Sequence, residues 1–323
     1  MCKGFLLSLT LLSVPFLQVC ARESGKDRQI AVFWNLENFF DTRDDPRKND
    51  DEFTPRGTRH WTYKKFIAKR NGIARTIVSM KEKYGLFPAI VAFAEVENRW
   101  VIEELTEKTP LSKLSYKIIH YESPDRRGID VALIYREELF KVIQCNSISV
   151  DQTLIGRPTR DLLRVAGLLD EDSTVIYVAH LPSKISGAWS SDHPRHVVIS
   201  TLSDSMEKDI SSGWKRIIVM GDFNDTPDSQ TISYFLKKSP YLRCISMEEF
   251  SKEAGTIKYK GRWELIDLAF ASEWITHATY NIFDSGFLLE KDNQYLGKKP
   301  KRCYNGPVYN AGLSDHLPIV VIL

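Results

Sequence analysis

Short apolar runs bounded by turn residues dominate the pattern of hydrophobic and polar positions along the chain. Runs of about four to eight apolar residues between turn signals are typical of buried strands. The strands predicted in this way cover residues 30–34, 88–94, 129–135, 174–179, 217–220, 265–271 and 317–322, with weaker ones near Tyr116 and Val165.

Helical patterns lie between some of these strands. Apolar residues recur at helical spacing among lysines and arginines over residues 63–83, which predicts an amphipathic helix. Further helices are expected over residues 100–106 and 192–206, the latter with Asp192 and Pro194 as its start signals. Because strands outnumber helices, we predict an α/β fold in which two sheets pack face to face with helices outside them.

Composition narrows the class of protein. The chain has 323 residues, of which 43% are hydrophobic and 27% charged, as in ordinary globular proteins. No repeat or low-complexity linker divides it, so we expect a single domain over residues 22–323. The formal net charge of +2 excludes a polycation, and binding to nucleic acid would depend on a local basic patch.

The N-terminal residues 1–21 have the pattern of a secretory leader. Lys3 supplies the positive charge, residues 5–16 are apolar, and residues 19–21 form a cleavage site. The apolar run is short for a membrane span. Residues 17–20 also loosely resemble a lipoprotein box, so we expect export, with a secreted, periplasmic or lipid-anchored protein (through Cys20) as the alternatives.

Three cysteines lie outside the leader region. Cys145, Cys244 and Cys303 are widely spaced and form no zinc-type motif. A disulfide-dense scaffold is excluded, and one disulfide plus a free thiol stays open.

Polar residues collect where the predicted strands end. Asp222 and Asn224 follow the strand over residues 217–220, and in an extended segment their side chains point to the same side. An acid beside an amide suits a hard cation and a phosphate oxygen. Asn35, Glu37, Glu95 and His180 follow other strands, Asp267 lies inside one, and Asp315 and His316 stand just before the last strand. Since unpaired buried charge is costly, this recurrence indicates a functional site.

An ordered set of motifs makes the interpretation specific. It consists of residues 33–38 (FWNLEN), 94–98 (AEVEN), 127–132 (RGIDVA), 179–183 (AHLPS), 221–225 (GDFND), 266–267 and 314–318 (SDHLP). The set resembles the endonuclease/exonuclease/phosphatase superfamily with its deoxyribonuclease I-like fold, and within it exported bacterial members. The resemblance implies a four-layered α/β sandwich of two mainly antiparallel sheets. It also implies phosphoester cleavage that depends on a divalent metal, Mg²⁺ or alternatively Mn²⁺.

The resemblance also implies roles for individual residues. Glu95 would be the main metal ligand, Asp315 would belong to the metal site, and Asn35 would contact the metal or the scissile phosphate. Asp222 and Asn224 would orient the attacking water and hold a phosphate oxygen.

Two histidines complete the implied catalytic set. His316, held by Asp267 or Asp315, and His180 would protonate or stabilise the phosphoryl and leaving oxygens. These residues also have structural alternatives. Asp267 would be a core acid, the Asp315–His316 pair would be a polar turn, and His180 would be a buried histidine with satisfied hydrogen bonds.

Three further residues keep two open interpretations each. Asp130 would orient His180 or form a core salt bridge. Glu37 would support the site from behind or be solvated. Arg195 would reach the substrate phosphate or lie on a solvated helix surface.

One residue departs from the family pattern. Relatives carry Asn where this chain has Ala179, directly before the His-x-Pro-Ser segment. If that Asn binds phosphate, Ala179 would weaken the activity or change the substrate.

Basic loops near the predicted site suggest the substrate. They contain Arg126, Arg127, Arg157, Arg160, Lys184 and residues 298–302. Basic loops with aromatic neighbours such as Tyr304 suit a sugar-phosphate backbone, so our first hypothesis is an exported nuclease. The alternatives are a hydrolase of a lipid or small-molecule phosphoester and a non-catalytic surface binding protein that retains the fold. No protein partner is implied, and we expect a monomer.

Overall fold

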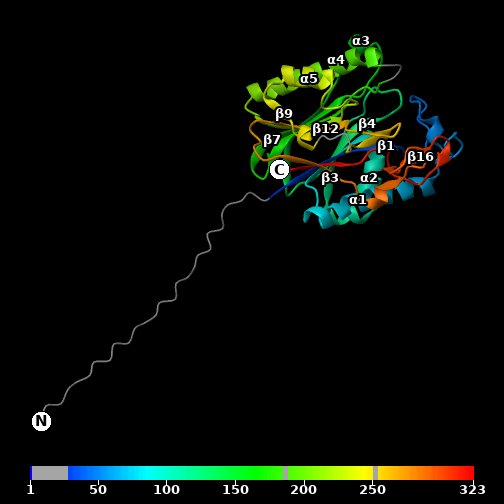
Figure 1. The fold of residues 1–323 in the computed structure, drawn as a ribbon, viewed down its shortest axis with the longest axis horizontal. Coiled ribbons are helices and arrows are strands. Elements are labelled where there is room, and N and C mark those ends of the chain that lie inside the picture. Colours follow the sequence, from blue (N-terminus) through cyan, green and yellow to red (C-terminus); the bar gives the residue numbers. More distant parts are fainter. Residues whose placement is uncertain (2–27, 185–187, 250–253) are drawn as a thin grey trace.

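The computed structural model describes Met1 and residues 28–184, 188–249 and 254–323. The predicted leader and Cys20 therefore lie outside the described residues. Two six-stranded sheets pack face to face, and the long helices cover their outer faces (Figure 1). No helix among the described residues is long and apolar enough to cross a membrane.

The first sheet holds both the first and the last long strands of the described chain. Its order is β13 (Thr279–Ile282), β18 (Ile319–Ile322), β1 (Ile30–Phe39), β2 (Ile90–Val96), β4 (Asp130–Arg136) and β3 (Tyr116–His120). Only β1 and β2 run parallel, and the other neighbours are antiparallel.

The second sheet repeats this plan. Its order is β5 (Phe140–Ile148), β6 (Leu162–Leu169), β7 (Asp172–His180), β8 (Arg216–Asp222), β12 (Asp267–Ser272) and β9 (Leu242–Cys244). Here β7 and β8 are the parallel pair. The predicted sandwich of two mainly antiparallel sheets is confirmed.

Helices form the two outer layers. α1 (Tyr63–Tyr84) and α2 (Arg99–Glu107) cover the first sheet, and α4 (Ala188–Ser211) and α5 (Gln230–Lys238) cover the second (Figure 1). Short helices and hairpins make up the connections: α3 (Gln152–Ile155), η1 (Asp51–Phe53), η2 (Pro110–Leu114), η3 (Ile245–Glu249), η4 (Gly286–Leu288), β10 (Ile257–Tyr259), β11 (Arg262–Glu264), β14 (Leu289–Lys291), β15 (Lys298–Pro300), β16 (Tyr304–Asn305) and β17 (Val308–Tyr309).

The start of α4 differs from the prediction. The helix begins at Ala188, so Asp192 and Pro194 lie inside it and do not mark its start. Start signals report local preference, which the packing of a whole helix against a sheet can override.

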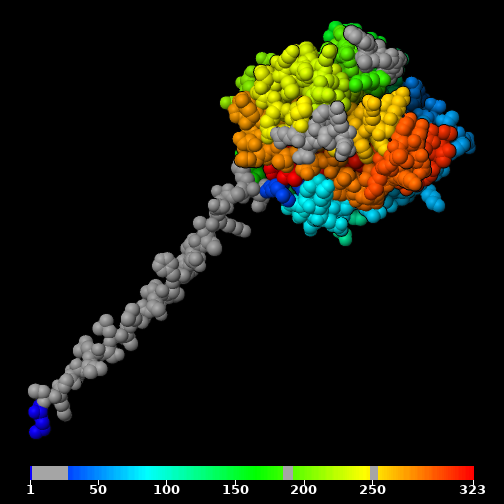
Figure 2. All heavy atoms as spheres, viewed as in Figure 1, coloured from blue at the N-terminus to red at the C-terminus, as the bar shows by residue number. Residues whose placement is uncertain are grey.

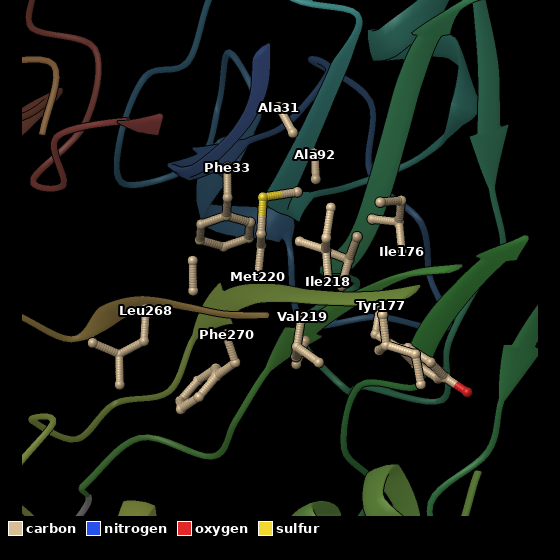
Figure 3. Packing of buried hydrophobic residues seen from close by; sticks show 14 of the residues in the cluster. Ala31, Phe33, Ala92, Ile176, Tyr177, Ile218, Val219, Met220, Leu268 and Phe270 are labelled. Carbon is tan, nitrogen blue, oxygen red and sulfur yellow. The ribbon is translucent and has the colours of Figure 1, made fainter. Parts of the chain in front are cut away.

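Strict alternation along the strands creates the core between the sheets. Figure 3 shows Phe33 and Ala92 of the first sheet facing Ile218 and Met220 of the second, while Val219 points to the opposite side. With a side-chain period of two, the next inward positions after Phe33 and Met220 are Asn35 and Asp222. The apolar core therefore ends in a polar pair.

Candidate active site

The inward polar positions open into a pocket of about 200 Å³ at the end of the sandwich. Its walls come from both sheets and from the loops that follow their strands. The lining residues are Asn35, Glu37, Asn38, Glu95, Arg127, Arg160, His180, Ser183, Asp222, Asn224, Arg302, Asp315 and His316.

Strained backbone shapes this pocket. Glu37, Asn38, Glu95 and Asn224 all have φ between 47° and 60°, in the left-handed region that non-glycine residues rarely adopt. The pairing of β1 with β2 shifts register where Glu37, Asn38 and Glu95 occur, so the strands bulge at their ends. Such strain persists only where the surroundings enforce it, and it gathers at functional sites.

Asp222 is the carboxylate at the centre of the pocket. Its Oδ2 accepts a hydrogen bond from Asn35 Nδ2 (2.9 Å), and its Oδ1 accepts one from the backbone amide of Asn224 (2.9 Å). Burial raises the pKa of Asp222 to about 7; the charge of His316 opposes this shift and that of Asp267 adds to it. The carboxyl group can therefore exchange a proton near neutral pH.

His316 is held by a carboxylate on its far side. Its Nδ1 lies 2.8 Å from Asp267 Oδ2, and its Nε2 lies 3.8 Å from both Asp222 Oδ2 and Asp315 Oδ1. Burial alone would lower the pKa of His316, but Asp267, Asp222 and Asp315 reverse this and raise it well above the usual value. Trp34 Nε1 donates to the backbone carbonyl of His316 (2.9 Å) and fixes the residue further. The ring thus presents a charged donor to the pocket.

His180 also lies beside Asp222. Its Nε2 is 3.6 Å from Asp222 Oδ2, and its buried Nδ1 has no hydrogen-bond partner among the described residues. Burial, followed by the charges of Arg160, Arg127 and His316, lowers the pKa of His180 well below its usual value. The two histidines therefore differ in charge.

Asp130 has a partner other than His180. Its Oδ2 lies 3.1 Å from His120 Nε2, and its Oδ1 accepts the Ser123 amide hydrogen (2.9 Å). Of the two interpretations left open for Asp130, the structure shows the core pairing, with His120 as the partner.

The acidic wall of the pocket offers oxygen ligands for a cation. Glu95, Asp315 and Asn35 line it, and Glu95 Oε2 accepts the Asn38 amide hydrogen (2.9 Å). Burial and then the charge of Asp315 raise the pKa of Glu37 to about 7. Carboxylate and amide oxygens form a donor set that fits a hard divalent cation such as Mg²⁺.

A second group of ligand-type atoms converges deeper in the site. Atoms of Asp222, Asp267 and His316 lie within 4.8 Å of one another. Because the His316–Asp267 hydrogen bond already uses two of these groups, we assign the cation to the Glu95 side.

Glu37 supports the site from behind. It is only 7% exposed, so the solvated alternative is wrong. Its carboxyl oxygens accept Arg302 Nε and the Cys303 amide hydrogen, both at 2.9 Å. The same guanidinium donates a hydrogen bond from Nη2 to Asp315 Oδ2 (2.9 Å).

Arg195 is placed elsewhere. Its side chain is fully buried, pairs with Asp192 and lies 3.3 Å from Asp225 Oδ2. It is not among the residues that line the pocket, and a solvated helix surface is also wrong. The pocket instead contains Arg127, Arg160 and Arg302, which the sequence identified only as basic loop residues.

Ala179 lies on the face of β7 opposite to His180. Tyr177, two positions earlier, points away from the first sheet (Figure 3) and donates to Asp209 of α4 (2.5 Å). By alternation Ala179 shares that face, while His180 lines the pocket. The side chain at position 179 therefore does not point at a phosphate in the pocket.

Comparison with known proteins agrees with this geometry. Residues 30–323 match the model of the Endonuclease/Exonuclease/phosphatase family, and the chain belongs to that family. A search of curated proteins gave no match.

Solved structures share the fold at low identity. Truncated TDP2 from Caenorhabditis elegans has a TM-score of 0.57 and 15% identity, covering 92% of this chain and 97% of its own. TDP2 from D. rerio in complex with a single-strand DNA product has a TM-score of 0.57 and 13% identity, covering 92% and 99%. A mannosyl-6-phosphatase from Bacteroides thetaiotaomicron has a TM-score of 0.56 and 15% identity, covering 91% and 99%. At these identities the likeness establishes the fold alone.

Proposed function

We propose that the chain is a divalent-metal-dependent phosphoester hydrolase and that its substrate is nucleic acid. One observation carries the hydrolase assignment. Asp222, whose carboxyl pKa is raised to about 7 by burial, lies 3.6 Å from His180 Nε2 and 3.8 Å from His316 Nε2 in a pocket that is also lined by carboxylate and amide oxygens.

The residues divide the chemistry between them. Glu95, Asp315 and Asn35 would hold Mg²⁺, which supplies positive charge to the phosphate oxygens. Asp222, ionised and oriented by Asn35, takes a proton from the attacking water as the water oxygen bonds to phosphorus. The bond between phosphorus and the ester oxygen breaks, and that oxygen leaves as an alcohol after it takes a proton from a solvent water molecule. Asp222 then returns the proton it received to solvent, which completes the balance.

The histidines act on the charge that develops. His316, held protonated by Asp267, donates from Nε2 to a phosphoryl oxygen in the transition state. His180 is neutral and can donate one hydrogen bond without bringing a second full charge beside His316.

Exposed cations around the pocket support nucleic acid as substrate. The side chains of Arg127, Lys184 and Arg302 are 44–48% exposed, and Arg127 and Arg302 line the pocket itself. Cations at this position can bind phosphates on either side of the scissile one. One protein of the same fold was solved with a DNA product, which is consistent with this substrate class.

A small-molecule phosphoester is the second candidate. The pocket of about 200 Å³ has room for a phosphate and little more, and one protein of the same fold is a mannosyl-6-phosphatase. A lipid substrate has less support. Residues 283–289 are the candidate segment for membrane contact, but Phe283 and Leu288 within it are buried.

We further propose that the protein is exported and acts as a monomer. The leader pattern of residues 1–21 motivates export. Cell fractionation of the full chain beside a chain lacking residues 2–21 tests it, because only the full chain should leave the cytoplasm.

Cleavage of plasmid DNA and RNA tests the substrate class. The protein from Arg22 onward is incubated with Mg²⁺, with Mn²⁺ or with chelator, beside Glu95→Ala and His316→Ala. Metal-dependent cleavage that both variants lose would support the nuclease proposal. Turnover of small phosphoesters without cleavage of nucleic acid would favour the second candidate, and no turnover of any phosphoester would favour a non-catalytic binding protein.

A further inference from the structure

A second cavity lies directly beside the candidate active site. This side pocket has a volume of about 190 Å³, and Glu37, Asn38 and Arg302 line both cavities. A phosphate in the active-site pocket can therefore extend its ester substituent into the side pocket. The inference that follows rests on the proposed phosphoester hydrolysis.

The remaining walls come from two segments that are far apart in sequence. Phe53 and Arg59 belong to the loop around η1, and Tyr304 and Gly306 to the β16–β17 hairpin. Figure 2 shows the blue segment that contains this loop beside the orange-red segment that contains the hairpin. Arg59 joins them, since its NH1 donates to the Gly306 carbonyl (2.6 Å) and its Nε donates to Glu52 (2.9 Å).

The aromatic rings of the side pocket have little free face for a stacked base. Phe53 stacks on Phe40 with centroids 4.5 Å apart, and the Arg59 guanidinium lies over its ring at 5.9 Å. The Tyr304 ring is covered by Arg59 at 5.2 Å and by Lys65 at 5.4 Å. Binding of a nucleobase by stacking needs an open π-face. These rings therefore offer mainly edges to an occupant.

The polar groups suit a hydroxylated ring instead. Arg59, Arg302, Glu37 and Asn38 line a space of about 190 Å³, which is about the size of one six-membered sugar. Such groups form hydrogen bonds with hydroxyls, and the apolar ring edges accommodate the C–H surface of the sugar. The position of Arg302 is fixed by its bonds to Glu37 and Asp315, so one wall is preorganised.

We infer that the side pocket binds the sugar carried by the substrate phosphate. The sugar is either the pentose of a nucleotide or a hexose of a sugar phosphate, because both present the same hydroxylated ring. Arg59 is then a specificity-determining residue that contacts the substrate away from the reacting phosphorus.

Substitution of Arg59 tests this inference with sugar-bearing and sugar-free substrates. Arg59→Met removes the guanidinium but keeps an apolar stem over Tyr304. The matched control is Arg56→Met, an exposed arginine of the same loop that lines neither cavity. The substrates are thymidine 5′-(p-nitrophenyl phosphate), a hexose 6-phosphate and bis(p-nitrophenyl) phosphate, which has no sugar.

We expect Arg59→Met to raise KM about tenfold for a sugar-bearing substrate, as loss of one charged hydrogen bond does. The kcat should stay close to that of the wild type, and bis(p-nitrophenyl) phosphate should be turned over as before. The substrate whose KM rises identifies the sugar as a pentose or a hexose, and either result supports the pocket. Equal effects on all three substrates, or none on any, would overturn it. Failure of the wild type on every substrate would instead contradict the proposed hydrolase function.

Discussion

Asn35 and Asp222 come from different sheets, and the side-chain amide of Asn35 donates a 2.9 Å hydrogen bond to the Asp222 carboxylate. The bond closes the polar end of the core and sets the orientation of the proposed general base. Because the Glu37 amide donates to Asn35 Oδ1 (2.9 Å), the donor itself cannot rotate freely.

Asn35→Ala should lower kcat by about 10²-fold, the usual effect of losing one preorganised donor at a site where charge develops. Steady-state kinetics on a metal-saturated phosphoester measure this. A thermal melt must accompany the kinetics, since an equal loss caused by unfolding would leave the role of Asn35 unsupported.

Asp267→Asn should move the alkaline limb of the pH–rate profile to lower pH. Burial would by itself lower the pKa of His316, and the charge of Asp267 does most to raise it. Without that charge His316 loses its proton at a lower pH, and activity that needs the charged donor is lost earlier as pH rises. The kcat should fall by roughly 10²- to 10⁴-fold as well. A profile that keeps its alkaline limb in place would contradict the pairing as the cause.

Glu97→Gln should stabilise the protein at pH 8. Burial, followed by the charge of Asp41, raises the pKa of Glu97 to about 9 in the folded state, against an ordinary value of 4.5. Between pH 4.5 and 9 the unfolded chain binds fewer protons at this group than the folded one, so its contribution to stability falls as pH rises. Glutamine can still accept the Asp41 amide hydrogen and has no charge to bury.

We expect a gain on the order of 1 kcal/mol at pH 8 that disappears near pH 4.5. Urea unfolding at both pH values measures it. The exposed Glu107→Gln serves as the control, and a gain that is the same at both pH values would argue against a titration effect.

Mg²⁺ should raise the melting temperature of the wild type, because a ligand that binds only the folded state stabilises it. At one hundred times its dissociation constant the gain is about 2.7 kcal/mol. Glu95→Gln should reduce this gain, whereas the melting temperature without metal should change little, since a glutamine side chain can still accept the Asn38 amide hydrogen. An undiminished shift would place the cation elsewhere.

Ala179→Asn should destabilise the protein without raising activity. Ala179 is fully buried on the face of β7 away from the pocket, and an added Cβ on its neighbour Gly221 would already lie 2.1 Å from the Ala179 carbonyl oxygen. Overpacking of such a position costs roughly 1–3 kcal/mol. Thermal melts and kinetics on the same preparation measure both effects, and a rise in kcat would show that the residue acts on the phosphate.

Periodicity in the sequence was enough to predict the sandwich. Strands such as β2 and β8 are apolar on both faces because a sheet lies on one side and helices on the other, and such runs are recognisable locally. The edge strand β5 was missed because only one of its nine residues is buried and its pattern is mixed. The predicted start of α4 near Pro194 was wrong because a start signal depends on a few neighbouring residues, whereas the packing of α4 is long-range.

The residues of the site likewise fall into those that the sequence identified and those that only the tertiary structure shows. Asp222 and His316 could be found because each stands beside an apolar strand within a family motif. Arg195 was a wrong choice for the pocket, and Arg302 an unassigned one, because helix and loop positions approach the site only through tertiary structure. The two proposed roles of Asp130 could not be separated without the position of His120, whose partnership crosses from β3 to β4.

The most direct test of the central claim is the metal-dependent hydrolysis of bis(p-nitrophenyl) phosphate by Asp222→Asn. Its matched control is Asp228→Asn, an exposed acid in the loop after the same strand. We predict that Asp222→Asn folds like the wild type, still gains stability from Mg²⁺ and loses at least about 10²-fold in kcat, while Asp228→Asn keeps full activity. Wild-type rates in a folded, metal-binding Asp222→Asn would contradict the assignment of Asp222 as the group that takes the proton from water.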